Sequence, residues 1–97
     1  MAALATHADD VLLLIDGQDR IAEANERAVA TYGWPREALV GRPVRELRDP
    51  SVQARFEDDW RSVREGGAHA FETLHRRHDG AAFPVEVSLG RAELEGA

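Results

Sequence analysis

Residues 13–25 read LLIDGQDRIAEAN, which is an apolar run, an Asp-Gly dipeptide and a second run. Residues 74–87 read LHRRHDGAAFPVEV and repeat this plan later in the chain. An Asp-Gly pair between two extended runs indicates a β-hairpin, because glycine supplies the positive φ that a tight turn needs. The chain is therefore expected to hold two hairpins. Their turn residues are Asp16, Gly17, Asp79 and Gly80.

Four segments around these turns are predicted to be strands. The residues 11–15 are apolar throughout, as in a strand buried on both faces, and residues 21–24 pair back onto them. Residues 71–77 and residues 82 to 93 form the second hairpin. In the latter, Val85 and Val87 alternate with polar residues, which is typical of an antiparallel strand with one wet face.

The middle of the chain is predicted to be helical. Asn25 is a good N-cap, Gly33 is placed to end that helix, and a second short helix ends at Gly41. The longest helix runs from Asp49 to Gly66 and carries one apolar stripe. The residues of this stripe are Val52, Phe56, Trp60 and Val63. Residues 2–8 are rich in alanine and predict a short leading helix.

Composition limits the possible functions. A chain of 97 residues with 43% hydrophobic residues predicts one domain with a small core. A net charge of −6 disfavours nucleic-acid binding. The absence of cysteine excludes disulfides, thiolate metal sites and cysteine nucleophiles. No apolar run approaches the roughly 20 residues that span a bilayer, and no signal peptide is evident. We therefore expect a cytoplasmic domain without direct membrane contact.

Four sequence pieces in this order resemble the PAS domain family over residues 9–94. They are residues 15–21 in the first hairpin, residues 24–25 at the next helix, residues 32–41 in the middle and residues 76–87 in the second hairpin. The resemblance implies an α+β fold, with an antiparallel sheet of strand order 2-1-5-4-3 and short helices on one face. A ligand pocket would lie between sheet and helices.

The chain departs from this pattern at its end. We count four strands, so the fifth, which the resemblance places in the middle of the sheet, is missing. We expect residues 1–97 to form one PAS-like domain, with residues 1–8 as a leading helix and residues 9–94 as the core. The unpaired inner edges would need partners. The sequence thus predicts an incomplete sheet or one completed by another molecule, and a closed five-stranded sheet within one chain would contradict this.

Large apolar side chains are expected to converge between helices and sheet. In a domain this small they either fill the space entirely or leave room for a small apolar or aromatic ligand, held by the Tyr32 hydroxyl or the Trp60 indole. The candidate pocket residues are Val29, Tyr32, Leu39, Leu47, Phe56, Trp60 and Phe71.

No resident cofactor or metal is predicted. Heme-binding members of the family use a histidine on the long helix, and residues 49–66 contain none. The light-sensing members bond flavin through a cysteine, which this chain lacks, so only non-covalent flavin stays open. The basic run of residues 75–78, which holds two of the four histidines, is interpreted as a solvated hairpin tip. His75 and His78 are three apart on a strand and point to opposite faces.

The sequence favours a signalling module over an enzyme. Neither a nucleophile motif nor a phosphate-binding motif occurs, and no catalytic residues are predicted. The expected function is a sensory and dimerisation module of a bacterial signal-transduction protein, for example a histidine kinase of a two-component system or a cyclic-di-GMP enzyme. Its expected partners are a second copy and an output domain of the same polypeptide. A ligand-free interaction module and a cofactor-bound redox sensor are the alternatives.

Overall fold

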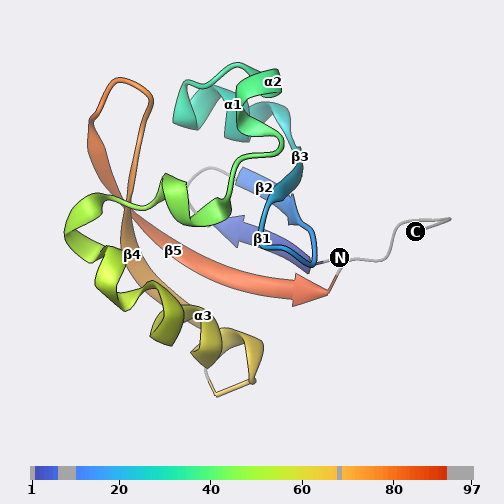
Figure 1. The fold of residues 1–97 in the computed structure, drawn as a ribbon, viewed down its shortest axis with the longest axis vertical. Helices are drawn as coiled ribbons and strands as arrows, with labels where there is room; N and C mark the ends of the chain where they lie inside the picture. Colours follow the sequence, from blue (N-terminus) through green and yellow to red (C-terminus); the bar gives the residue numbers. More distant parts are fainter. Residues whose placement is uncertain (1, 7–10, 68, 92–97) are drawn as a thin grey trace, which may run out of the picture.

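The structure is a computed structural model, and it describes residues 2–6, 11–67 and 69–91. Strands stand at both ends of this range and helices in the middle, so the fold is α+β (Figure 1). In chain order the elements are β1 (Ala2–Thr6), β2 (Val11–Ile15), β3 (Ile21–Ala24), α1 (Glu26–Tyr32), α2 (Arg36–Leu39), the 3-10 helices η1 (Val44–Leu47) and η2 (Pro50–Arg55), α3 (Phe56–Arg64), β4 (Ala70–Arg76) and β5 (Ala82–Arg91).

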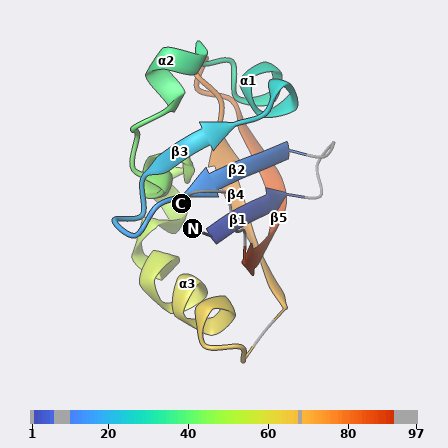
Figure 2. The ribbon, with the colours of Figure 1, turned by 90° about the vertical axis from the view of Figure 1, so that its right-hand side faces the viewer.

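The strands form one sheet in the order β3-β2-β1-β5-β4, and each neighbouring pair is antiparallel (Figure 2). Val11, Leu13 and Ile15 of β2 are buried on one face of this sheet, as are Val85 and Val87 of β5. The helices supply the other half of the core through side chains such as those of α1 and α3. The helix-covered face therefore holds the core and any internal site.

The predicted leading helix over residues 2–8 is wrong, because Ala2–Thr6 form β1 in the centre of the sheet and residues 7 and 8 lie outside the described ranges. Alanine favours helices, but β2 and β5 both present backbone groups that need partners at this position. β1 runs from Ala2 opposite Ile15 to Thr6 opposite Val11, and it also pairs with residues 87–91. Sheet pairing here overrides local propensity.

The chain itself thus fills the position that the resemblance gives to a fifth strand. The prediction of an incomplete sheet, or of one completed by another molecule, is wrong for the same reason: a five-stranded sheet forms within residues 2–91. The four strands expected from the sequence all form, with β4 and β5 at Ala70–Arg76 and Ala82–Arg91.

Asn25 joins the first hairpin to the helical region. Its side-chain Oδ1 accepts hydrogen bonds from the backbone N–H of Ala28, at 2.9 Å, and of Leu12, at 3.1 Å. The first bond caps α1 and the second holds the residue beside β2. At the other end of α1, Gly33 takes a left-handed conformation at φ 76° and its N–H bonds the Val29 carbonyl.

The two hairpin turns differ in which residue adopts the left-handed backbone conformation. In the second, Gly80 has φ 92° and Asp79 Oδ1 accepts from the Ala81 N–H. In the first, the left-handed residue is Asp19 at φ 60°, so the expectation that Gly17 supplies a positive φ is wrong. Asp16 Oδ1 accepts hydrogen bonds from two backbone N–H groups further along this turn. These bonds place the left-handed conformation at Asp19, and aspartate is a residue type that tolerates this conformation.

The cap at Asn25 gives a direct test of this local architecture. We expect Asn25→Ala to lower the free energy of unfolding by about 1–2 kcal/mol, because the substitution removes the acceptor for an otherwise unpaired helix N–H. Urea denaturation followed by circular dichroism measures the change. Asn25→Asp keeps an acceptor oxygen and serves as the matched control; an equal loss in both variants would contradict the assigned role.

Candidate ligand pocket in the core

The residues predicted to line a pocket do share the core. Five of them are buried, whereas Val29 and Phe71 are partly buried and pack against that core. The buried five are Tyr32, Leu39, Leu47, Phe56 and Trp60. The aromatic rings follow one another, with centroids 5.7 Å apart for Phe56 and Trp60 and 6.4 Å for Trp60 and Phe71.

A cavity that borders this cluster is very small. The cavity between α3 and the sheet measures about 10 Å³, which is room for about one water molecule. Only Phe56, Trp60 and Phe71 of the seven candidates line it. The other lining residues are Val44, Arg48, His75 and Val87. At this cavity the side chains therefore leave no space for an organic ligand.

His75 is a core residue that the sequence interpretation placed in a solvated hairpin tip. Its side chain is buried, at 4% exposure, and its Nδ1 lies 2.6 Å from the Tyr32 hydroxyl oxygen. The period of two along β4 places Thr73 and His75 on the buried face, with Arg76 exposed. Counting that period from Phe71 would have identified His75 as an inward residue.

Burial keeps both partners of this hydrogen bond uncharged. It lowers the pKa of His75 to about 3, with a further contribution from the nearby Arg48 guanidinium. It also raises the pKa of the Tyr32 hydroxyl well above its ordinary value. A neutral phenol and a neutral imidazole thus share one hydrogen bond between α1 and β4.

Arg48 brings a charge into the same region. It is 3% exposed and donates to the Asp59 carboxylate at 2.9 Å and to the Val52 carbonyl at 3.2 Å. Its guanidinium carbon lies 5.2 Å from the Phe56 ring centroid and 5.4 Å from that of Phe71. The ion pair balances the buried charge, and removal of Asp59 alone would leave that charge uncompensated.

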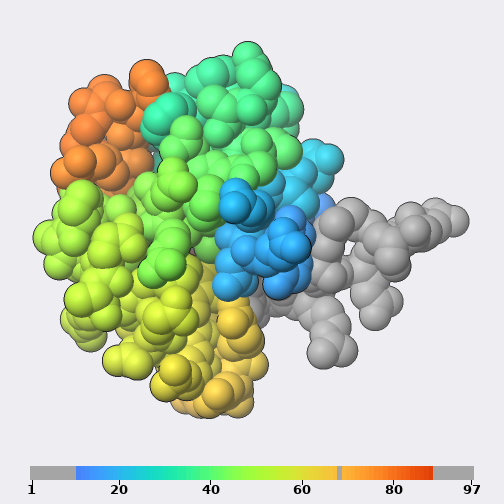
Figure 3. All heavy atoms as spheres, in the orientation of Figure 1, coloured from blue at the N-terminus to red at the C-terminus, as the bar shows by residue number. Residues whose placement is uncertain are grey.

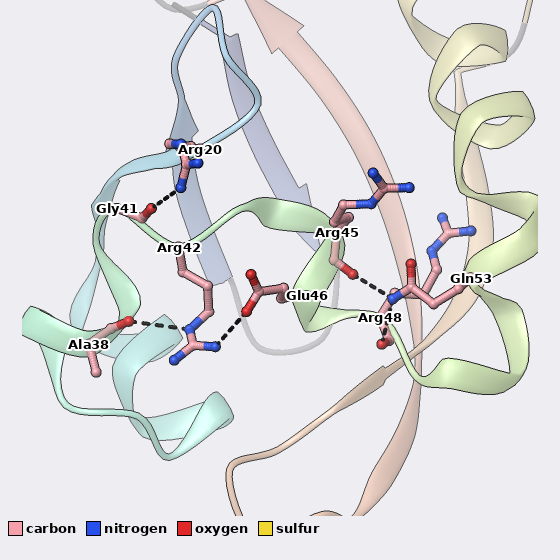
Figure 4. A network of polar contacts seen from close by, with 8 residues as sticks. All are labelled: Arg20, Ala38, Gly41, Arg42, Arg45, Glu46, Arg48 and Gln53. Atoms are coloured by element: carbon pink, nitrogen blue, oxygen red, sulfur yellow. Dashed lines mark hydrogen bonds and ion pairs between the residues drawn. The ribbon is translucent and has the colours of Figure 1, made fainter.

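The segment that carries Arg48 is held from several sides (Figure 4). The side-chain amide of Gln53 donates to the carbonyls of Arg45, at 2.7 Å, and Arg48, at 3.1 Å. Arg42 bonds Glu46 at 2.9 Å within the same segment. These contacts fix η1 against η2, and so they fix the direction from which Arg48 enters the core.

One buried polar atom on the same sheet face has no hydrogen-bond partner within the described part of the chain. It is Oγ1 of Thr73, which lies on β4 between Phe71 and His75. An unpartnered buried hydroxyl costs free energy, so most native structures avoid one. The polar groups of this region are thus Arg48, His75, Tyr32 and Thr73, and sequence reasoning identified only Tyr32.

Metal-binding geometry does not occur in the described ranges, where no group of three or more His, Asp or Glu side chains is positioned to hold an ion. His69 and His78 are exposed, and His7 lies outside these ranges. Among the described helices none has the length and apolar character needed to cross a membrane.

A hollow of about 260 Å³ lies on the surface and shares only Phe56 with the predicted pocket. It is bounded by the β2–β3 turn, by Pro43 with η1, and by the start of α3, on the face shown in Figure 3. Its charged side chains include both signs. The lining residues are Gln18, Asp19, Arg20, Pro43, Arg45, Phe56 and Glu57.

The order of elements and the helix-covered sheet match a known family. The family model described as the PAS fold matches residues 5–96. The chain belongs to the PAS fold family. PAS folds are signalling modules, and the chain is one of them.

Solved structures agree on the PAS fold. The PAS domain of a Colwellia psychrerythraea protein superposes with a TM-score of 0.65 at 17% identity, covering 97% of this chain and 87% of that one. The blue-light activated histidine kinase of Erythrobacter litoralis gives a TM-score of 0.51 at 17% identity, covering 97% of this chain and 35% of the kinase chain.

A longer bacterial protein is similar in sequence. An uncharacterized protein of Azorhizobium caulinodans is 28% identical in an alignment of 93 positions that covers 90% of this chain. The chain spans 13% of the length of that relative.

The buried His75 predicts a pH-dependent stability. Its pKa is near 3 when folded and near 6.5 when unfolded, so the unfolded chain binds more protons between these values. The contribution of His75 to the free energy of unfolding is therefore fully present above about pH 6.5. It decreases as the pH falls toward 3, by at most about 1.4 kcal/mol per pH unit.

Urea unfolding between about pH 7 and pH 5, where carboxylates stay ionised, measures this slope. We expect His75→Phe to flatten it. The exposed His78→Gln variant is the control and keeps the wild-type slope. Equal slopes in wild type and His75→Phe would contradict a buried neutral His75.

The Tyr32 hydroxyl is expected to matter for stability. Tyr32→Phe leaves the Nδ1 of a buried imidazole unpaired, so unfolding should become easier by about 1–3 kcal/mol. In the His75→Phe background the same substitution removes no hydrogen bond. A double-mutant cycle measured by urea denaturation should therefore show coupling; purely additive effects would show that the hydrogen bond contributes nothing.

Proposed function

We propose that this PAS module relays a signal by protein–protein contact within a longer bacterial signalling protein, such as a histidine kinase or a cyclic-di-GMP enzyme. The observation that carries the proposal is the close packing between α3 and the sheet, where the cavity of about 10 Å³ leaves no room for an organic ligand. The histidine kinase among the structural neighbours and the length of the Azorhizobium relative support a multidomain context.

The mechanism that fits this core is a population shift. A partner that binds one arrangement of helices against the sheet better than another raises the population of that arrangement. An output domain of the same polypeptide then responds through its own contact with the module. No chemical step is required, and the coupling is reciprocal between the two binding events.

The face of the sheet opposite the helices is the surface we assign to a second copy. Leu12 on β2 is 49% exposed, and Leu14 on the same side is partly buried. Covering an aliphatic side chain this exposed with another surface gains free energy. We therefore propose a homodimer that packs these outer faces together.

A small apolar or aromatic ligand is the second candidate, and the polar groups of the core favour it. Arg48, His75 and the unpartnered Thr73 hydroxyl lie in or beside the region of the cavity. A ligand would need the Phe56, Trp60 and Phe71 rings to move apart. A flavin needs far more room than this cavity gives, so that alternative is not carried forward.

Native mass spectrometry of the purified chain separates the two candidates. A filled core predicts the mass of the protein alone, with a dimer that grows with concentration. Extra mass that disappears on denaturation would instead show a bound ligand and would contradict the filled-core proposal.

Leu12→Asp tests the assigned dimer surface. We expect dimer affinity to fall at least tenfold, because a carboxylate replaces a side chain that would be desolvated, while the fold persists because Leu12 is exposed. Ala54→Asp adds the same charge at an exposed position of η2 and is the matched control. Sedimentation measures both; an unchanged dimer in Leu12→Asp would place the interface elsewhere.

A further inference from the structure

The surface hollow beside the β2–β3 turn has walls that are tied to one another. The backbone N–H of Val44 donates to the Asp19 carbonyl at 2.9 Å, which joins the turn to the start of η1. The Asp19 carboxylate accepts a hydrogen bond from Arg64 of α3 at 2.8 Å, which joins the same turn to the long helix. The hollow of about 260 Å³ is therefore a preformed space, as binding sites for small molecules usually are.

Part of the lining of the hollow is apolar. Phe56, which is buried, and Pro43, which is half-buried, both line it. The guanidinium carbon of Arg45 lies 5.1 Å from the centroid of the Phe56 ring. A molecule in the hollow can therefore contact apolar surface and a cation at the same time.

The charged groups around the hollow leave one cation without an anion. Arg64 pairs with Asp19, and Arg45 lies 3.9 Å from the Glu57 carboxylate. Arg20 lines the hollow as well, and it forms no ion pair within the described part of the chain. Three guanidinium groups thus face two carboxylates, so one negative charge from a ligand would balance them.

Both arginines that line the hollow keep donors for a ligand. A guanidinium group carries five N–H donors, and Arg20 uses Nη1 to donate to the Gly41 carbonyl at 3.0 Å (Figure 4). The 3.9 Å between Arg45 and Glu57 is longer than a hydrogen bond, and both side chains are mostly exposed. Such an ion pair is weak, so a ligand can take the place of Glu57. Guanidinium groups bind carboxylates in a planar geometry with two parallel hydrogen bonds.

We propose that this hollow binds a small organic monocarboxylate with an apolar body. The carboxylate lies between Arg20 and Arg45, and the apolar part contacts Phe56 and Pro43. A phosphate dianion fits less well, because its second charge meets the two carboxylates of the lining without a further cation to balance it. The hollow is open to solvent, so we expect weak and reversible binding that does not survive purification. The inference does not depend on the proposed relay by protein contact, and the failure of one leaves the other standing.

Titration with sodium benzoate at constant pH and ionic strength tests the proposal. We expect saturable shifts of the backbone amide NMR signals of Gln18, Asp19 and Glu57, and of the side-chain Nε–H signals of Arg20 and Arg45. Benzyl alcohol carries the same ring without a charge, and inorganic phosphate carries charge without a ring. Each should bind at least about tenfold more weakly than benzoate, because each makes only part of the contacts.

Substitution of the unpaired arginine locates the site. Arg20→Gln should weaken benzoate binding by about tenfold, because it removes the cation that no carboxylate balances. The fold should persist, since Arg20 is exposed, and the dispersion of the NMR spectrum checks this. Arg45→Gln is a second variant with the same expected loss. Arg61→Gln is the matched control and should bind benzoate like the wild type, because Arg61 is exposed on α3 and does not line the hollow.

Four results would overturn the proposal. The first is a titration without saturable shifts at the lining residues. The second is an equal loss of affinity in Arg20→Gln and Arg61→Gln, which would show attraction to overall charge. The third is phosphate binding as tight as that of benzoate, which would contradict the monocarboxylate. The fourth is a set of shifts centred on Trp60 and His75, which would place benzoate in the core instead of the hollow.

Discussion

Backbone pairing at the centre of the sheet is the constraint on which this fold depends. β1 lies between β2 and β5, and its hydrogen-bonding groups are required on both sides. The helices then cover one face and bring Tyr32 and Trp60 onto the core. The positions of the buried polar groups follow, because β4 is aligned with β5, and β5 is aligned with β1.

Most of the helical region and four strands could be predicted from the sequence, because local signals agree with the final contacts. Asn25 at a helix start and Gly33 at a helix end act through atoms only a few residues away. The leading helix was wrong because alanine propensity is a local signal, whereas the need for a central strand arises from β2 and β5. Composition and hydrophobic periodicity describe neighbouring residues. They cannot reveal a backbone-pairing requirement that arises from distant segments.

The core site was predictable in its apolar part and not in its polar part. Phe56 and Trp60 are spaced at helical period, so their burial follows from the stripe on one helix. Arg48 directly follows η1 and is buried with its charge neutralised by Asp59 of α3, and no short-range pattern encodes that pair. The size of the cavity depends on how all these side chains pack together, which a sequence motif does not contain.

The most direct test of the account is whether residues 2–6 form the central strand. We predict cross-strand nuclear Overhauser effects from Leu4 to both Leu13 and Leu89, with extended secondary chemical shifts over residues 2–6. Helical shifts over these residues, with neither cross-strand effect observed, would contradict the central position of β1. The folded core would then require another partner for β2 and β5.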